Sequence, residues 1–212
     1  MPLRDPERTR ERLLSAAEDL FAEDGYEHTT MQAVGERAGY ARSTPAYFFG
    51  SKDDLYRAVL MRLFERAQAV LSTAHEAAAG DAGRPREMLE SLIGAYLDFV
   101  ADDENFVSIV QRESAMRRTW LRETLEHALV VGDALGALTA TLGERLTPAQ
   151  ARHLVVSVSA LVWYPFAQAH TLLAALGIDP RDAAFREEHK RQITNVLLAA
   201  LAAESPTGNS SP

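Results

Sequence analysis

Four residues in one short stretch of this chain, Arg42, Ser43, Thr44 and Tyr47, have side chains that could recognise another molecule. When such a stretch is the second helix of a helix pair docked in a DNA groove, its early residues meet base edges. Hydroxyl groups and backbone N–H groups then hold the phosphates. The chemistry that these residue types predict is therefore contact with duplex DNA.

Two short helices and a turn must position these side chains. Thr30 can cap the first helix, after which apolar residues recur at helical spacing until Gly39 ends it with a positive φ. Pro45 is tolerated only in a first helical turn, so the second helix should begin near Ser43, which can cap it. This order predicts a helix-turn-helix over about residues 30–50.

The order and spacing of the capping, turn and closing residues in this segment resemble those of a known family. Thr30 opens the first helix, Ala38-Gly39 forms the turn, and Tyr47, Phe49, Gly50, Ser51 and Lys52 close the motif. An apolar stripe precedes it, formed by Leu13, Leu14, Ala17, Leu20 and Phe21 before the Asp24-Gly25-Tyr26 break. Over residues 7–65 the chain resembles the N-terminal domain of TetR/AcrR-type transcriptional regulators.

The resemblance implies DNA contacts at Thr30, Arg42, Ser43, Thr44, Tyr47 and Lys52, with Tyr47 and Lys52 on phosphates. The chain departs from the family pattern at Ala33, Pro45 and Ala46, and the last two leave the base preference open. Other interpretations also stay open. Tyr47 could be a core aromatic, and Lys52 could be a solvated neighbour of the acids that follow it. A helix-Gly-helix corner also occurs in all-α interaction proteins whose helix-turn-helix binds no DNA.

Composition limits the other possibilities. The chain has 212 residues, 47% of them hydrophobic, so it can bury a sizeable core, and its net charge of −8 is not that of a broadly basic DNA binder. Positive charges are instead local, at Arg4, Arg8, Arg10 and Arg12 near the N-terminus, which predicts a few placed phosphate contacts. The absence of cysteine excludes disulfides and thiol catalysis, and together with a charged N-terminus it suits a cytoplasmic protein.

The rest of the chain reads as helix throughout, so the predicted fold class is all-α with about nine helices in total. A three-helix DNA-binding domain at residues 7–65 should precede a helical effector-binding and dimerisation domain at residues 66–203. Further helices are expected over residues 53–79, from Pro85, over residues 119–142, and from Pro148 after the cap residue Thr147. Residues 204–212 are Ser/Pro/Gly/Asn-rich and are expected to be disordered.

The stretch from Leu154 to Leu176 contains no charged residue and is long enough to span a membrane. Its polar residues and Pro165 favour a helix buried in a soluble protein, with one side packed internally and the other on a second copy. The last helix has a similar apolar stripe, so the two helices of each copy predict a four-helix interface in a homodimer. The predicted interface residues are Val158, Leu161, Ile193, Val196, Leu197 and Leu201.

Aromatic side chains gather in the second domain and could line a site for a small, largely apolar effector. The candidates are Tyr96, Phe99, Phe106, Trp120, Trp163, Tyr164, Phe166 and His170. Aromatics at helical spacing could equally form a plain core. The family resemblance implies an effector pocket here, and binding of the effector is expected to lower the affinity for DNA.

The sequence gives little support for an enzymatic function. The chain has no Glu-x-x-His pair, no cluster with metal-ligand spacing and no phosphate-binding Gly-rich loop, so we predict no catalytic residue, no metal and no cofactor. The function predicted from the sequence is a homodimeric transcriptional regulator. It is expected to be a repressor that binds a palindromic, double-stranded operator and is released by a small effector, without a membrane-spanning part.

Overall fold

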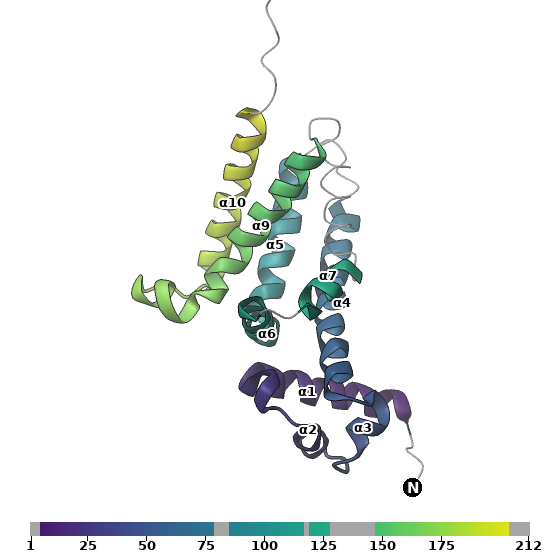
Figure 1. The fold of residues 1–212 in the computed structure, drawn as a ribbon. Helices are drawn as coiled ribbons and strands as arrows, with labels where there is room; N and C mark the ends of the chain where they lie inside the picture. The colour runs from purple at the N-terminus through teal and green to yellow at the C-terminus, as the bar shows by residue number, and fades with distance from the viewer. Residues whose placement is uncertain (1–4, 79–84, 117–118, 128–146, 204–212) are drawn as a thin grey trace, which may run out of the picture. The chain divides into compact units, whose positions relative to one another are not determined.

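The computed structural model describes residues 5–78, 85–116, 119–127 and 147–203, and these residues are almost wholly helical (Figure 1). They form nine α-helices and one π-helix, and no strand occurs among them. The predicted all-α fold with its N-terminal helix-turn-helix is confirmed. The chain divides into two compact units, residues 1–66 with 103–128 and residues 67–102 with 129–212.

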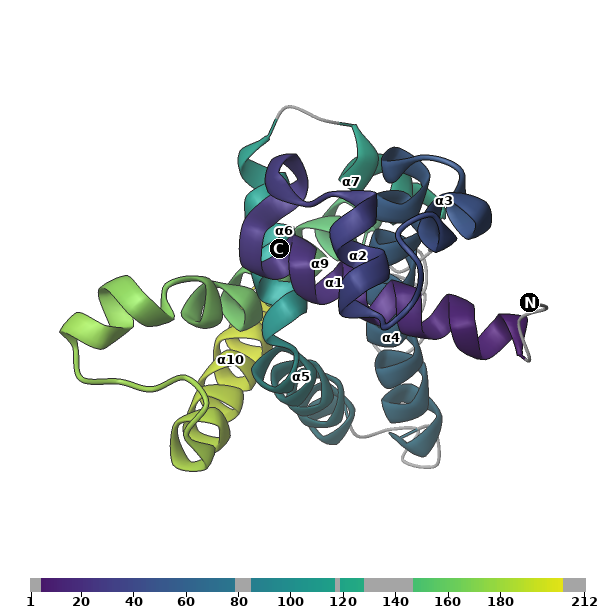
Figure 2. The same ribbon diagram turned by 90° about the horizontal axis from the view of Figure 1, so that it is seen from below.

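The first unit contains the helix-turn-helix. Its helices are α1 (Pro6–His28), α2 (Met31–Arg37), α3 (Thr44–Phe49), the first part of α4 (Lys52–Ala78), α6 (Glu104–Ala115) and α7 (Trp120–His127). Helix α2 packs against both α1 and α3 (Figure 2). The core is formed by fully buried side chains of α1, α2 and α4, among them Leu13, Leu14, Phe21, Val34, Leu55, Leu60 and Leu63.

This unit extends beyond the region 7–65 expected from the sequence, because α6 is fastened to the end of α1. Gly25 has φ 78° and ψ 169°, which interrupts the helical backbone near the end of α1. Ser108 Oγ donates to the carbonyl of Ala22 at 3.0 Å, and Arg112 Nη2 donates to that of Glu23 at 3.1 Å. Side chains of α6 thereby hold the backbone of α1 just before Gly25.

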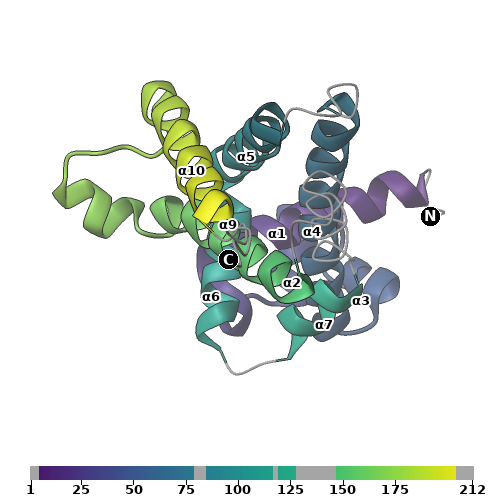
Figure 3. The same cartoon turned by 90° about the horizontal axis from the view of Figure 1, so that it is seen from above.

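The second unit consists of the end of α4, α5 (Pro85–Asp102), α9 (Pro148–Ala167), the π-helix η3 (Ala169–Leu173) and α10 (Ala183–Ala203). Helix α5 packs against both α9 and α10 (Figure 3). The predicted start of α9 is confirmed, because Thr147 caps it in a capping box with Gln150 and Pro148 follows in the first turn. The buried core includes Leu89, Ile93, Leu97, Val100, Val162, Phe166, Ile193 and Leu197.

The uncharged stretch from Leu154 to Leu176 is not one continuous α-helix. Helix α9 contains Pro165 and ends at Ala167, and the π-helix η3 follows. None of the helices that the structure describes combines the length and the apolar character needed to cross a membrane. Leu154, Val162 and Phe166 are buried, whereas Val156 and Tyr164 are exposed, so the helix has a packed side and an open side.

The structure corrects part of the predicted dimer interface. Ile193 and Leu197 are each only 2% exposed and belong to the core of their own protomer, so they cannot lie on a free surface. Their neighbour Val196 is 55% exposed, because it lies about 100° around α10 from Leu197, at the edge of the packed stripe. Val158 and Leu161 of α9 are half-buried.

Several expectations fall outside the described residues. They are the side chain of Leu201, the predicted helix beyond residue 127, and the tail 204–212.

Candidate nucleic-acid interface

Helix α2 and its cap agree with the sequence pattern. Thr30 is the N-cap, and its hydroxyl oxygen accepts a hydrogen bond from the backbone N–H of Ala33 at 3.1 Å. Helix α2 ends at Arg37, and Gly39 follows with φ 77°, a conformation that glycine adopts without strain. The turn then leads to Thr44, where α3 begins.

Gly35, which belongs to none of the sequence motifs, lets α2 and the start of α3 approach closely. A β-carbon at this position would lie 2.8 Å from the carbonyl oxygen of Ala41 and 3.3 Å from Cδ of Pro45. Both neighbours are held firmly, one in the backbone and one in a proline ring. The available signal was a glycine inside a helix, where it is normally unfavourable by about 1 kcal/mol.

Helix α3 directs Pro45 inward and Tyr47 outward. Pro45 is buried in the first turn, whereas Tyr47 is 80% exposed and Thr44 is partly exposed. The ring of Tyr47 contacts that of Phe48 edge to face, with centroids 5.4 Å apart. Tyr47 is therefore not a core aromatic, and its hydroxyl is presented to solvent.

Ser43 differs from the sequence expectation. It occupies the N-cap position of α3, but its side chain makes no capping hydrogen bond. The physical reason is its backbone, which has φ −85° and ψ −12° instead of the extended conformation that brings a cap hydroxyl over the helix end. The hydroxyl of Ser43 is thus exposed at the surface.

Arg42, beside Ser43, is also exposed, and its Nε lies 2.5 Å from a carboxylate oxygen of Glu36. Two more cations lie near the motif. The guanidinium of Arg10 stands over the ring of Phe49, and that of Arg12 over the ring of Tyr40, each 5.3 Å from the ring centroid. Positive charge thus accompanies α3 although the net charge of the chain is negative.

Lys52 is neither a solvated surface residue nor free to meet a phosphate in this geometry. Its Nζ donates to the carbonyls of Thr29 at 2.9 Å and Glu27 at 3.3 Å. It also stands 4.2 Å from the ring centroid of Tyr26. The ammonium group, which has three donors, is thus directed at the linker between α1 and α2.

A cluster of charges joins α1, α4 and the start of α6 in the first unit. The buried carboxylate of Glu18 pairs with Arg62 and Arg66, and Arg66 also pairs with Asp103 at 2.5 Å. Burial alone would raise the pKa of Glu18, but hydrogen bonds from the two arginines outweigh it, so the pKa is lowered. Asp103 additionally caps α6 by accepting from the N–H of Phe106 at 2.8 Å.

The aromatic residues predicted to line one effector site are divided between the two units. Phe106 and Trp120 belong to the first unit, where Phe106 packs edge to face on Phe64 with centroids 5.5 Å apart. The reason is that α6 packs on α1 and that Trp120 of α7 packs on Tyr26 and Tyr56. The second unit holds Tyr96, Phe99, Trp163, Tyr164, Phe166 and His170.

Within the second unit these side chains differ in environment. Phe166 is core, whereas Tyr164 is half exposed and His170 lies exposed on η3. Burial raises the pKa of Tyr96 to about 12. The indole nitrogen of Trp163 is buried and has no hydrogen-bond partner among the described residues.

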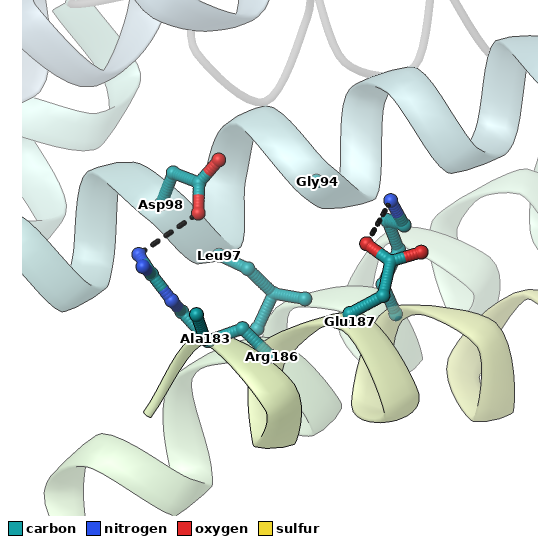
Figure 4. A pocket seen from close by; sticks show the side chains of 7 residues that line it. Gly94, Leu97, Asp98, Ala183, Arg186 and Glu187 are labelled. Atoms are coloured by element: carbon teal, nitrogen blue, oxygen red, sulfur yellow. Dashed lines mark hydrogen bonds and ion pairs between the residues drawn. The ribbon is translucent and has the colours of Figure 1, made fainter. Parts of the chain in front are cut away.

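A groove of about 210 Å³ lies between α5 and α10 (Figure 4). It is lined by Gly94, Leu97, Asp98, Ala183, Arg186, Glu187 and Lys190. Arg186 reaches across to Asp98 at 2.9 Å, and Lys190 pairs with Glu187 at 2.7 Å, so its cations already have carboxylate partners. The Arg186–Asp98 pair links α10 to α5, whereas the Lys190–Glu187 pair lies within α10. Among the described residues, no group of three or more acidic or histidine side chains could hold a metal ion.

Two family models match the chain. One, described as bacterial regulatory proteins of the tetR family, matches residues 13–59. The other, described as the tetracyclin repressor-like C-terminal domain, matches residues 85–197, which is more than half of the chain.

Individual proteins are similar over nearly the whole length. The transcriptional repressor NicS of Pseudomonas putida is 23% identical over 204 residues, which cover 92% of this chain and 93% of NicS. The transcriptional regulator RutR of Escherichia coli is 24% identical over 195 residues, covering 91% and 90% of the two chains. The crystal structure of a TetR-family regulator of Mesorhizobium loti has a similar fold, with a TM-score of 0.72 at 18% identity, covering 92% of this chain and 96% of that one.

Proposed function

The chain belongs to the tetR family of bacterial regulatory proteins and is a DNA-binding transcriptional regulator, and from this premise we propose that it is a homodimeric, ligand-responsive repressor of a palindromic operator. The observation that carries the proposal is the exposed side of α3, with Tyr47 80% exposed and the hydroxyl of Ser43 unengaged. Relatives described as repressors support the sign of regulation.

In this proposal α3 enters the major groove. Ser43 and Thr44 lie at the start of α3, where side chains reach base edges. Tyr47 follows and hydrogen-bonds to the DNA backbone. Arg42 and Thr30 then meet phosphates from either side of the turn. Because Arg42 shares its charge with Glu36, the phosphate contact requires that this exposed pair opens, which costs little in water.

The dimer would use the open sides of the last helices. Large apolar side chains are exposed on α9, α10 and the segment between them, namely Val156, Tyr164, Leu172, Leu176 and Val196. Apolar side chains gathered on the helices of one unit favour a protein partner, and a second copy presents the same two helices in return. The proposed interface therefore consists of these exposed residues and not of Ile193 and Leu197. The half-buried Val158 and Leu161 lie at its margin.

The effector site is proposed in the second unit, near Tyr96, Phe99 and Trp163. A small, largely apolar ligand with one acceptor group would satisfy the buried indole N–H of Trp163. No catalytic role is proposed, since the family and the relatives are transcriptional regulators. A cytoplasmic location agrees with a protein that must reach DNA.

The test is selection of the purified chain against random duplex DNA at moderate salt, followed by sequencing of the retained molecules. An enriched inverted repeat with half-sites about one helical turn apart is expected. With that operator, Arg42→Ala should weaken binding and flatten the salt dependence by about one unit, the effect of one lost phosphate contact. The matched control is Arg191→Ala, which removes an exposed arginine of the second unit. A folded dimer that enriches no sequence would refute the proposal and favour an interaction protein.

A further inference from the structure

We propose that Trp120 of α7 is a positioning residue for DNA binding, acting through Tyr26 and Lys52 on the linker that leads into the helix-turn-helix. The inference rests on the proposed DNA contacts of α3. It assigns to Trp120 and Lys52 roles different from those expected from the sequence, namely an effector contact and a phosphate contact.

The first step is the linker itself. Thr29 is the C-cap of α1, and its buried hydroxyl lies between the carbonyls of Leu20 and Gly25, at 3.1 and 2.9 Å, and shares its proton with them. Lys52 holds the carbonyl of Thr29 from the other side. The next residue, Thr30, caps α2, so the position of this linker fixes where α2 begins.

The second step leads from Lys52 to Tyr26. The ammonium group lies against the Tyr26 ring, a cation–π contact that also orients the ammonium toward the two carbonyls. The hydroxyl of Tyr26 donates to Asp53, the residue after Lys52. Tyr26 therefore fixes both residues at the start of α4, and a displaced ring would release the lysine.

The third step leads from Tyr26 to α7. The ring of Trp120 packs edge to face on that of Tyr26, with centroids 5.0 Å apart, and on that of Tyr56 at 5.5 Å. Arg57 lies over the Trp120 ring at 5.6 Å. Trp120 is the first residue of α7, so the docking of α7 determines whether the Tyr26 ring is supported.

This path has a consequence that a phosphate contact at Lys52 would not have. When a lysine neutralises a phosphate, its removal lowers the salt dependence of binding by about one unit. When the lysine holds the protein backbone, its removal weakens binding at every salt concentration and leaves the slope unchanged. Loss of the Trp120 ring should then have the same effect as loss of the lysine, because both act on the same linker.

The experiment is a double-mutant cycle on the full-length chain, with binding to the selected operator measured over a range of salt. Lys52→Met keeps the length of the side chain, and Trp120→Leu removes the ring. Each is expected to raise the Kd about ten-fold with an unchanged salt slope, and the double variant about ten-fold as well, since coupled residues are not additive. Trp120→Phe should restore most of the affinity, and Phe185→Leu, which removes an aromatic ring stacked on His189 in α10 of the other unit, serves as control.

The outcomes separate the two proposals. If the unmodified chain binds no operator, the proposed function fails. If it binds and folded Trp120→Leu binds equally well, or if the double variant loses about a hundred-fold, the inference is overturned. If Lys52→Met lowers the salt slope by about one unit, Lys52 contacts a phosphate and the inference is overturned. If the melting curve shows that Trp120→Leu does not fold, Trp120→His takes its place in the same cycle, because histidine keeps a smaller planar ring. The same outcomes then test the inference.

Discussion

The two units of this protein are held together by different kinds of interaction. In the first, polar side chains at single positions hold the backbone, as when Lys52 donates to the carbonyl of Thr29 and Ser108 donates to that of Ala22. In the second, the helices are joined mainly by apolar sides, with Ile193 and Leu197 of α10 in the core. A unit that must present a few groups to DNA needs defined backbone positions, whereas a core of aliphatic side chains tolerates many sequences.

Buried charge shows the same difference. The first unit encloses Glu18 between Arg62 and Arg66, and it also buries a hydrogen bond from the hydroxyl of Tyr56 to Glu113 at 3.0 Å. Ion pairs described in the second unit, such as that of Arg186 with Asp98, involve more exposed carboxylates. The first unit should therefore respond to pH and to single polar substitutions, and the second to changes of apolar volume.

The largest expected effect is in the second unit. Leu197→Glu places a carboxylate in the core, where an unpaired charge costs several kcal/mol, and should unfold this unit. Val196→Glu changes the adjacent, exposed position and should leave each protomer folded while the dimer dissociates. Circular dichroism measures the first effect and sedimentation the second. A Val196→Glu protein with unaltered dimer mass would place the interface elsewhere.

A smaller effect is expected from a single methyl group in the first unit. Gly35→Ala would press a β-carbon against the carbonyl of Ala41 and should destabilise the helix-turn-helix by about 1–3 kcal/mol, despite the better helix propensity of alanine. Gly94→Ala is the matched control, because its β-carbon would meet only the flexible side chain of Lys190 at 3.2 Å. Thermal melting and operator affinity measure both. Equal melting temperatures would show that the α2–α3 contact can relax.

The sequence predicted the first unit well because its signals are local. The Thr30 cap, the Gly39 turn and Pro45 in a first turn each determine the backbone within a few residues, and all three agree with the structure. The hydroxyl of Ser43 was expected to cap α3 and does not, since capping depends on a ψ angle that composition does not determine.

The sequence predicted side-chain environments less well wherever they depend on packing between distant segments. Periodicity identified an apolar stripe on α10 but could not tell Val196, which faces outward, from Leu197, which faces the core. Residue type alone places Trp120 with the effector aromatics, although in the structure it packs on Tyr26, which is far away in the sequence. The docking of α6 on α1 likewise has no local signal.

The pH dependence of stability tests the buried charges of the first unit. The pKa of Glu18 is lower in the folded chain than its ordinary 4.5, so the folded state binds fewer protons. Its contribution to stability is complete above that value and is lost as the pH falls through the folded pKa. Glu18→Gln should cost about 1–2 kcal/mol at neutral pH, since both arginines reach solvent, and should make melting less sensitive to acid. A variant with the acid sensitivity of the original chain would show that other carboxylates cause it.

The smallest expected effect concerns Tyr96 in the second unit and has the opposite pH direction. Burial disfavours its phenolate and raises its pKa to about 12, from the ordinary 10.0. Between these values the unfolded chain loses this proton while the folded chain keeps it, so stability should fall as the pH rises through that range. Tyr96→Phe should remove this part of the alkaline loss, whereas Tyr164→Phe, at a half-exposed position, should not. Alkaline melting curves of the three proteins measure the difference. If Tyr96→Phe melts with the same alkaline dependence as the original chain, the hydroxyl of Tyr96 is hydrated, and the interior of the second unit is more polar than its aliphatic core indicates.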